Sequence, residues 1–266
     1  MSRLTRRLGA WLLVTGGLSL LGGHAWAECR GLHMARAPRP RVQLAAASNA
    51  LVTIQWFGHN FFQLTSSRGT RVLTDPYGPG SFPLPDVLPH VITVGREHIH
   101  HNFVAIARNA PIVLRGLTLG GADWNPVSRA VRDVMIYSVP VFQGGWIEGQ
   151  RKGSAFVFEM DELCIAHLGD LAHPLTKQQL DVIGRVDVAL VPIDGTYTMG
   201  PETAQKVLGQ LTPRIAIPMH YWDNDALLGR FLAGLPRVRR LPTDTITVSK
   251  ASLPAPTEIV VLTHHP

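Results

Sequence analysis

Three histidines fall within four residues in the segment at residues 95–102, namely His98, His100 and His101. This segment follows the apolar run at residues 91–94, which we expect to form a strand covered on both faces. Neutral imidazole is the commonest metal ligand in proteins, and a turn at a strand end can direct several rings into one cleft. The pattern therefore predicts a metal site.

Two later segments place further donor groups at strand ends. Asp170 follows the apolar run at residues 163–167, and Gly169 allows the chain to turn so that the carboxylate faces inward. His220 follows a second apolar run, at residues 215–218. Histidines and one carboxylate from separate strand ends form a ligand set that suits Zn²⁺ and leaves room for water.

The rest of the chain predicts the elements that position these groups. Apolar runs and alternation predict strands at residues 51–56, 61–65, 72–74, 91–94, 134–141, 153–159, 163–167, 186–191, 215–218, 245–249 and 258–262. Helices are predicted at residues 102–108, 176–184, 201–211 and 225–235. Strand-rich stretches at both ends, with helices between them, suggest an α/β fold of two packed sheets with helices outside.

These motifs resemble the metallo-β-lactamase superfamily, in its lactonase and N-acyl-phosphatidylethanolamine phospholipase D-like branch of metal-dependent hydrolases. Besides the histidine-rich turn, the resemblance rests on Trp56-Phe57-Gly58-His59, Thr74-Asp75-Pro76, His167-Leu168-Gly169-Asp170, the segment at residues 192–199 and Ile217-Pro218-Met219-His220-Tyr221. It covers residues 51 to about 262. It implies a four-layer αβ/βα sandwich, with metals at the top edge of the two sheets.

The metal turn departs from the family pattern, which is His-x-His-x-Asp-His. Aligned on the last histidine, Arg96 stands where the first His belongs and His100 stands where the Asp belongs. A further family histidine is replaced by Phe142 or Gln143. Of the three histidines of the family's first metal site, only His98 remains.

The second metal site of the family is better preserved. Its ligands map to His100, His101, Asp170 (the bridging carboxylate) and His220. We therefore expect at most one tightly bound ion, Zn²⁺ or else Mn or Fe, with His98 adjacent, because the cationic Arg96 disfavours a second cation. A shifted register, with His98 and His100 as the first pair, is the alternative; it leaves Asn102 and Phe103 where Asp and His belong.

With a metal ion bound by these ligands, the neighbouring polar side chains would have roles in catalysis or in orienting the ligands. Bound zinc lowers the pKa of water to about 7 and polarises a carbonyl or phosphoryl oxygen. Asp170 would orient that water, and Arg96 would stabilise an oxyanion or anchor an anionic substrate. Asp75 and His59 resemble groups that orient ligand histidines, although for His59 a structural hydrogen bond within the hairpin is the alternative.

The site favours a mononuclear hydrolase that cleaves an ester, lactone, amide or phosphodiester in a small-molecule substrate. The replaced ligands leave open a non-catalytic descendant that binds a small anionic ligand or a protein, and a histidine-rich metal-buffering protein is the third hypothesis. Lys and Arg are spread along the chain, apart from Arg237-Val238-Arg239-Arg240, so we expect no nucleic-acid partner.

The first 27 residues are typical of an export signal. Arg3, Arg6 and Arg7 precede an uncharged apolar stretch, and Ala25-Trp26-Ala27 gives the small-x-small pattern of a cleavage site. The stretch is short for a membrane span, so we expect no stable membrane anchor and a periplasmic or secreted mature protein. Cleavage would lower the net charge from +6 to +3, because it removes three arginines and no acidic residue.

The mature chain is predicted to hold one domain. Residues 28–50 lack periodicity and are expected to form a flexible lead-in, and residues 51–266 are long enough for a single core. The only cysteines of the chain are Cys29 and Cys164. We expect Cys164 to be a small buried apolar residue and Cys29 to be an unconstrained thiol.

Overall fold

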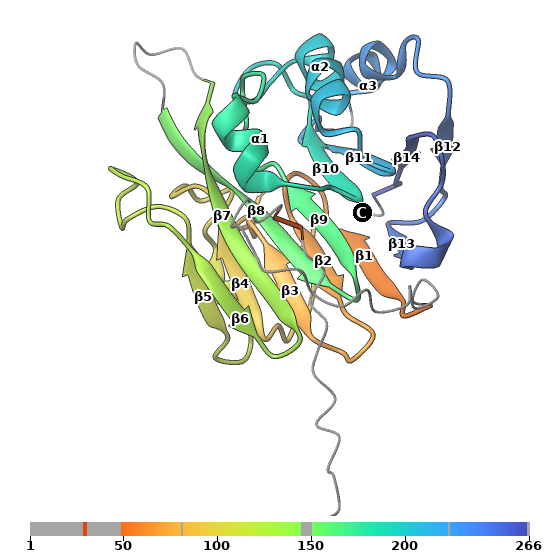
Figure 1. Cartoon of the computed structure of the whole chain (residues 1–266). Helices are drawn as coiled ribbons and strands as arrows, with labels where there is room; N and C mark the ends of the chain where they lie inside the picture. The colour runs from red at the N-terminus through yellow and green to blue at the C-terminus, as the bar shows by residue number, and fades with distance from the viewer. Residues whose placement is uncertain (1–28, 31–48, 81, 145–150, 223, 265–266) are drawn as a thin grey trace, which may run out of the picture.

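A computed structural model of the chain describes residues 29–30, 49–80, 82–144, 151–222 and 224–264. In these residues two β-sheets pack together, with three α-helices beside the second sheet (Figure 1). The expected export signal at residues 1–27 lies outside the described residues, as does most of the lead-in at residues 28–50. Within the described part of the chain, no helix is long and apolar enough to cross a membrane.

The first sheet has six strands in the order β13-β1-β2-β3-β4-β5. Its strands are β1 (Val52–Trp56), β2 (Phe62–Thr65), β3 (Arg71–Thr74), β4 (Val91–Val94), β5 (Ile112–Arg115) and β13 (Thr245–Val248). Strands β3 and β4 run parallel. Asp75 and Gly95, which directly follow these two strands, therefore leave the sheet at the same edge.

The second sheet has eight strands in the order β12-β14-β11-β10-β9-β8-β7-β6. Its strands are β6 (Ser128–Val131), β7 (Val134–Gln143), β8 (Arg151–Met160), β9 (Leu163–His167), β10 (Val188–Pro192), β11 (Ile215–Met219), β12 (Val238–Arg240) and β14 (Glu258–Val261). Strands β9, β10 and β11 are parallel neighbours. Their carboxyl ends deliver Asp170, Asp194 and His220 to one edge.

The helices are α1 (Lys177–Ile183), α2 (Pro201–Leu211) and α3 (Asp225–Leu232). The predicted bounds of α2 are confirmed at both ends, with Pro201 at the start, where its missing N–H costs nothing. The helix predicted at residues 102–108 is wrong. Only the 3-10 turn η1 (Val104–Ile106) forms there, since Ile106 N donates to Phe103 O at 3.2 Å and Ala107 N to Val104 O at 3.3 Å, in each case three residues back and not four.

The core divides between the two faces of the first sheet, because strand side chains alternate. Val72 and Val91 join the large core shared with the second sheet. Leu73 and Ile92 point the other way, into a smaller core that also includes Ile106 of η1. This two-sheet sandwich confirms the expected α/β architecture.

Three strands were missed by the sequence pattern, namely β5, β6 and β12. All three lie at sheet edges and carry mostly exposed side chains. An edge strand needs no apolar alternation, so its sequence does not separate it from a loop.

The expected free thiol at Cys29 is wrong. Cys29 is buried and forms a disulfide with Cys164 of β9, across 135 positions of the chain. The backbone supports this attachment, because Cys29 O accepts a hydrogen bond from Arg185 N at 2.8 Å. The guanidinium of Arg30 stacks on the ring of Tyr137, 3.6 Å from its centroid. This part of the lead-in is therefore anchored to the second sheet.

Candidate metal centre

The turn after β4 carries His101 into the interior. The backbone N–H of Gly95 donates to an oxygen of Asp75 at 2.6 Å, and the N–H of His101 donates to His98 O at 2.8 Å, which closes the turn. A Cβ at Gly95 would come within 2.5 Å of the carbonyl oxygen of Ser154. Only glycine fits this close approach between the two sheets, and the turn delivers His101 with 1% exposure.

Two further turns add His59 and His220. His59 lies between β1 and β2 in a left-handed conformation, with φ of 49°, and His220 follows β11 with φ of 57°. The two turns are joined, because His220 N donates to His59 O at 3.3 Å. Both side chains are buried, and their ring centroids lie 3.9 Å apart.

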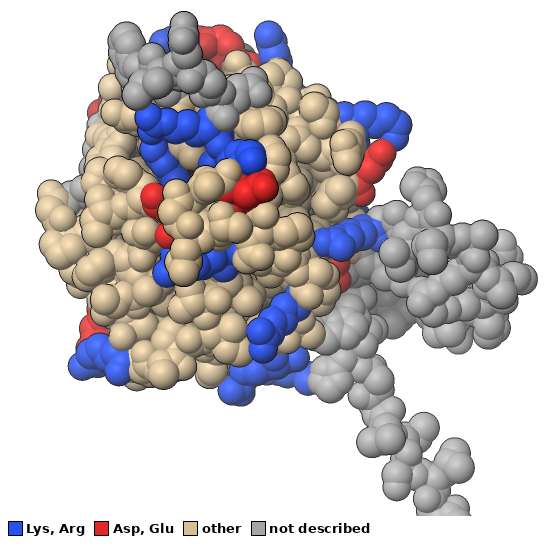
Figure 2. Space-filling model, turned by 90° about the vertical axis from the view of Figure 1, so that its left-hand side faces the viewer, with Lys and Arg blue, Asp and Glu red and all other residues tan. Residues whose placement is uncertain are grey.

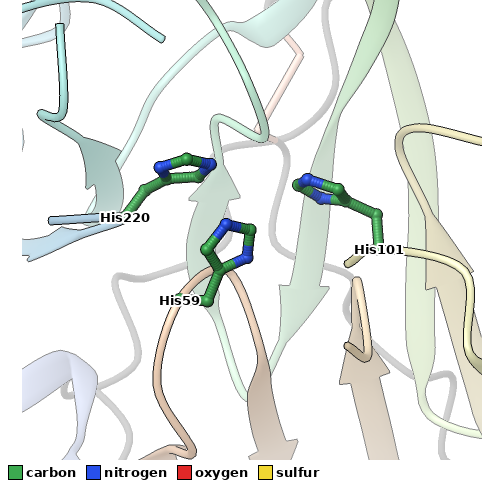
Figure 3. A group of neighbouring side chains, drawn as sticks. All are labelled: His59, His101 and His220. Atoms are coloured by element: carbon green, nitrogen blue, oxygen red, sulfur yellow. The ribbon is translucent and has the colours of Figure 1, made fainter. Parts of the chain in front are cut away.

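The imidazoles of His59, His101 and His220 converge from three separate segments, as Figure 3 shows. Each offers a nitrogen, and these atoms lie within 4.8 Å of one another. Within the described structure, the buried Nδ1 of His59 has no hydrogen-bond partner. Three buried imidazoles with an unpartnered nitrogen among them fit a Zn²⁺-type ion, whose ligand number and chemistry they match.

The carboxylate of Asp170 closes the cluster. Gly169 precedes it with φ of 55°, and a Cβ at Gly169 would come within 2.9 Å of Ser154 O, so the turn requires glycine. Four side chains surround the two oxygens: Arg96 at 2.7 Å, Asn60 Nδ2 at 2.8 Å, His101 Nε2 at 3.3 Å and His220 Nε2 at 3.5 Å. Asp170 therefore contacts both the histidines and the guanidinium of Arg96.

Two carboxylates orient the rings of His101 and His220. Asp75 lies 3.1 Å from Nδ1 of His101, and Asp194 lies 2.9 Å from Nδ1 of His220. In both rings Nε2 is the nitrogen that faces Asp170. A carboxylate behind a histidine fixes the ring and its tautomer, which is the usual support of a metal-binding imidazole.

Electrostatics hold Asp170 ionised and His59 neutral. Burial acts to raise the pKa of Asp170, but the neighbouring His101, His220 and Arg96 outweigh it and lower that pKa to about 2. Burial, followed by the nearby His220, lowers the pKa of His59 well below its usual value. An ionised carboxylate and a neutral imidazole are the forms that bind a metal.

The other two histidines of the turn lie at the rim. His98 is exposed and His100 is half-buried, and their rings lie 4.9 Å apart. The ring of His100 lies 5.9 Å from that of His59. Burial and the charge of Arg96 lower the pKa of His98 to about 4, so it is neutral at pH 7.

Of the ligands predicted from the sequence, the structure brings together His101, Asp170 and His220. His59, expected to orient a ligand, lies in the cluster itself, whereas Asp75 lies behind His101 as an orienting group. Sequence reasoning gave no role to Asn60 or Asp194. Asp194 carried a usable signal, because it follows the end of β10 just as Asp170 and His220 follow the ends of β9 and β11.

Comparison with known proteins gives the family. Residues 53–220 match the family model for the beta-lactamase superfamily domain. The chain is 31% identical to a protein of Thermococcus onnurineus over 194 residues, which cover 64% of this chain and 85% of that protein. It is 29% identical to a protein of Methanoculleus marisnigri over 184 residues, which cover 63% of this chain and 80% of that one. Both are named UPF0173 metal-dependent hydrolases.

A solved structure from Thermotoga maritima, described as a candidate Zn-dependent hydrolase, has 30% identity and a TM-score of 0.63. The match covers 79% of this chain and 98% of that one. With its two-sheet sandwich and histidine cluster, the chain belongs to the metallo-β-lactamase superfamily, in the family of UPF0173 proteins. The superfamily expected from the motifs is confirmed.

Proposed function

We propose that this protein is an exported metal-dependent hydrolase that binds one Zn²⁺ and cleaves an ester, lactone, amide or phosphodiester bond in a small-molecule substrate. The observation that carries the proposal is the convergence of His59, His101 and His220 around the ionised Asp170. The names of the two archaeal relatives, metal-dependent hydrolases, support the same reaction class.

Different side chains of the site would bind the metal, orient water and stabilise negative charge. His59, His101 and His220 would hold the ion, with Asp170 as the fourth donor. When bound, zinc supplies a Lewis acid and lowers the pKa of water to about 7. Asp170 would accept a hydrogen bond from a water molecule and so orient it. Arg96 would donate hydrogen bonds to an oxygen on which negative charge develops.

The expectation of a single ion rests on what occupies the family's other metal position. Arg96 replaces one histidine there, and its guanidinium pairs with Asp170 at 2.7 Å. Its side chain is 13% exposed, so solvent screens its charge only in part. A second cation beside this guanidinium would meet Coulomb repulsion.

Metal analysis and turnover test the proposal together. The protein without residues 1–27 is purified, analysed for Zn, Mn and Fe, and assayed with nitrophenyl esters, lactones, amides and a phosphodiester before and after metal reconstitution. His220→Gln should lose both metal and turnover. The matched control is His90→Gln, at the other end of β4, where Nδ1 only accepts from Arg71 N. Absence of metal above trace, even after reconstitution, would overturn the proposal.

Export draws support from the disulfide. Disulfides persist in oxidising compartments such as the periplasm and are rare in the cytosol. Cys29 and Cys164 are joined in the fold, and the leader-like segment ends just before Cys29. Expression of the full chain followed by fractionation and mass spectrometry should give a mature form that begins at Glu28 with the bond formed. A full-length cytoplasmic chain with free thiols would contradict export.

A second function is favoured by one specific observation, the ion pair between Arg96 and Asp170. This pair neutralises the carboxylate that should orient water. A neutralised carboxylate would favour a protein that binds a ligand without cleaving it. Tight ligand binding without turnover, in fully metal-loaded protein, would support this alternative. Turnover lost in His220→Gln with the fold intact would exclude it.

A further inference from the structure

A cavity of about 410 Å³ opens beside the histidine cluster, and its lining includes Arg96 and Gln143, which replace histidines of the family pattern. Arg96 and His98 line it from the turn after β4, Gln143 from the end of β7, and Arg151 and Lys152 from the start of β8. Arg96 connects the cavity to the metal centre, because the same guanidinium contacts Asp170. A ligand in this cavity would therefore lie next to the reacting groups.

The charges around the cavity leave an excess of positive charge. Its acidic member, Glu97, is already paired with Arg115 at 2.7 Å. Lys152 pairs with the exposed Asp123 at 2.8 Å. Arg151 has no ion-pair partner within the part of the chain that the structure describes. Figure 2 shows Lys and Arg side chains spread over one side of the molecule, with fewer acidic ones among them.

Gln143 adds a buried acceptor that nothing in the described structure satisfies. The residue is 6% exposed, and its Nε2 donates to Lys152 O at 2.7 Å. A carbonyl can only accept, so this bond fixes which end of the amide is the NH₂ group. The remaining atom, Oε1, is buried without a partner. A buried acceptor left unpaired is costly, so a ligand that offers a donor there gains affinity.

We propose that this cavity binds the anionic group of the substrate, an oxyanion that carries its own O–H or N–H next to the charge. Arg151 and Lys152 attract the charge, and Oε1 of Gln143 accepts the hydrogen bond. The inference deepens the proposed function, since it names the substrate class as small anions such as hydroxy acids, acylated amino acids or phosphate monoesters. Arg96 then lies between the bound anion and Asp170.

Two pairs of small probes separate charge from hydrogen-bond donation. Inorganic phosphate is protonated at pH 6.5 and sulfate is not, and glycolate carries a hydroxyl that acetate lacks. Binding is measured calorimetrically on metal-free protein. Phosphate should bind at least about fivefold more tightly than sulfate, and glycolate more tightly than acetate, since one hydrogen bond to Oε1 is worth about that much. Preference within only one pair identifies the headgroup as phosphoryl or carboxylate. No preference in either pair overturns the proposal.

Variants assign the effect to residues. Gln143→Met keeps the size of the side chain but removes the acceptor, so the preference for phosphate over sulfate should disappear. Arg151→Gln should weaken both anions by roughly threefold or more, because it removes charge and not the acceptor. The control is Arg230→Gln, on α3, which removes an exposed cation paired with Glu202. An equal loss in the control would mean non-specific attraction and overturn the proposal.

The same titrations on zinc-loaded protein separate this inference from the proposed function. Selective phosphate binding in a protein that binds no metal would support the cavity and overturn the hydrolase. A metal-loaded, active protein without anion selectivity would overturn the cavity and leave the hydrolase standing. Because Arg151→Gln changes a surface residue, its result stays interpretable even where Gln143→Met folds poorly.

Discussion

Arg96 donates a hydrogen bond from its guanidinium to Asp170 at 2.7 Å, at a position where the family pattern has a metal-binding histidine. The side chain of Asp170 is 1% exposed, so the pair is largely shielded from water. Close charges interact more strongly there than at the surface. The arginine thus offsets part of the negative charge that would attract a metal ion to this carboxylate.

The first prediction is that Arg96→Met raises the affinity for zinc by about tenfold or more, because a cation that repels the ion is removed. Arg96→Lys keeps the charge and should leave the affinity near that of the wild type. Competition with a chelating dye measures both variants. Weaker zinc binding in Arg96→Met would show instead that the arginine is needed to hold Asp170 in place.

The second prediction restores the family's first metal position. The double variant Arg96→His, Gln143→His supplies two imidazoles beside His98, which with Asp170 complete a ligand set for another ion. We expect the zinc content to rise from about one to about two ions per chain. Native mass spectrometry measures this content, and each single variant serves as a control. If the double variant still binds one ion, the prediction is wrong and these residues do not form the family's first metal position.

The third prediction distinguishes His59 from His100 as a ligand. The structure places His59 inside the cluster and His100 at its rim, whereas the sequence alone favoured His100. Loss of a metal ligand should cost more than the 10–100-fold that is typical for an orienting group. His59→Gln should therefore weaken zinc binding by more than about 100-fold, and His100→Gln by about tenfold or less. If His100→Gln weakened zinc binding more than His59→Gln, the ligand set predicted from the sequence would be correct.

The reason that the sequence favoured His100 is conformational. Spacing along one turn indicates which residues are close in the chain, but backbone angles decide which rings point inward. His59 enters the cluster through a left-handed residue, with φ of 49°, on a hairpin that lies 42 positions before His101. No local pattern predicts that angle. Asp170 and His220 were predictable, because each follows an apolar strand whose carboxyl end had to reach the same edge.

The disulfide shows a second limit of sequence reasoning. Strand β9 was predicted from its apolar run, and Cys164 was correctly expected to be buried there. The partner of that cysteine, however, lies in a segment without periodicity, and two cysteines alone do not indicate a bond. Helix α2 is the opposite case. Its proline at the start and its apolar spacing both act locally, so its bounds could be predicted to the residue.

The fourth prediction concerns this disulfide. It closes a long loop, so its removal should lower the free energy of unfolding by about 2–4 kcal/mol. Cys29→Ser and Cys164→Ala should each lose this amount in urea denaturation. Reduction should destabilise the wild type but leave both variants unchanged, which separates the bond from the packing of Cys164. An unfolding curve of the wild type that reductant does not shift would contradict the bond.

The fifth prediction concerns pH and the end of the sandwich away from the metal centre. Ser66 Oγ donates to Asp133 at 2.7 Å, and Thr70 Oγ1 donates to its other oxygen, which ties the β2–β3 turn to the β6–β7 turn of the second sheet. Partial burial acts to raise the pKa of Asp133, but the bonds from Thr70 and Ser66 outweigh it and lower that pKa. The ionised form is therefore favoured by folding.

A carboxyl whose pKa is lower in the folded state stabilises the protein above its unfolded pKa, which is about 3.9. This stabilisation is lost as the pH falls through the folded pKa. At pH 7, Asp133→Asn should cost about 1 kcal/mol, because the carboxylate is only partly buried and solvent weakens its bonds. The difference between wild type and variant in urea denaturation should stay constant from about pH 7 to 5 and shrink below about pH 4. Ser66→Ala, which removes one donor, should show part of the same dependence. A difference that grows on acidification would contradict the assignment, because it would require the pKa of Asp133 to be raised by folding.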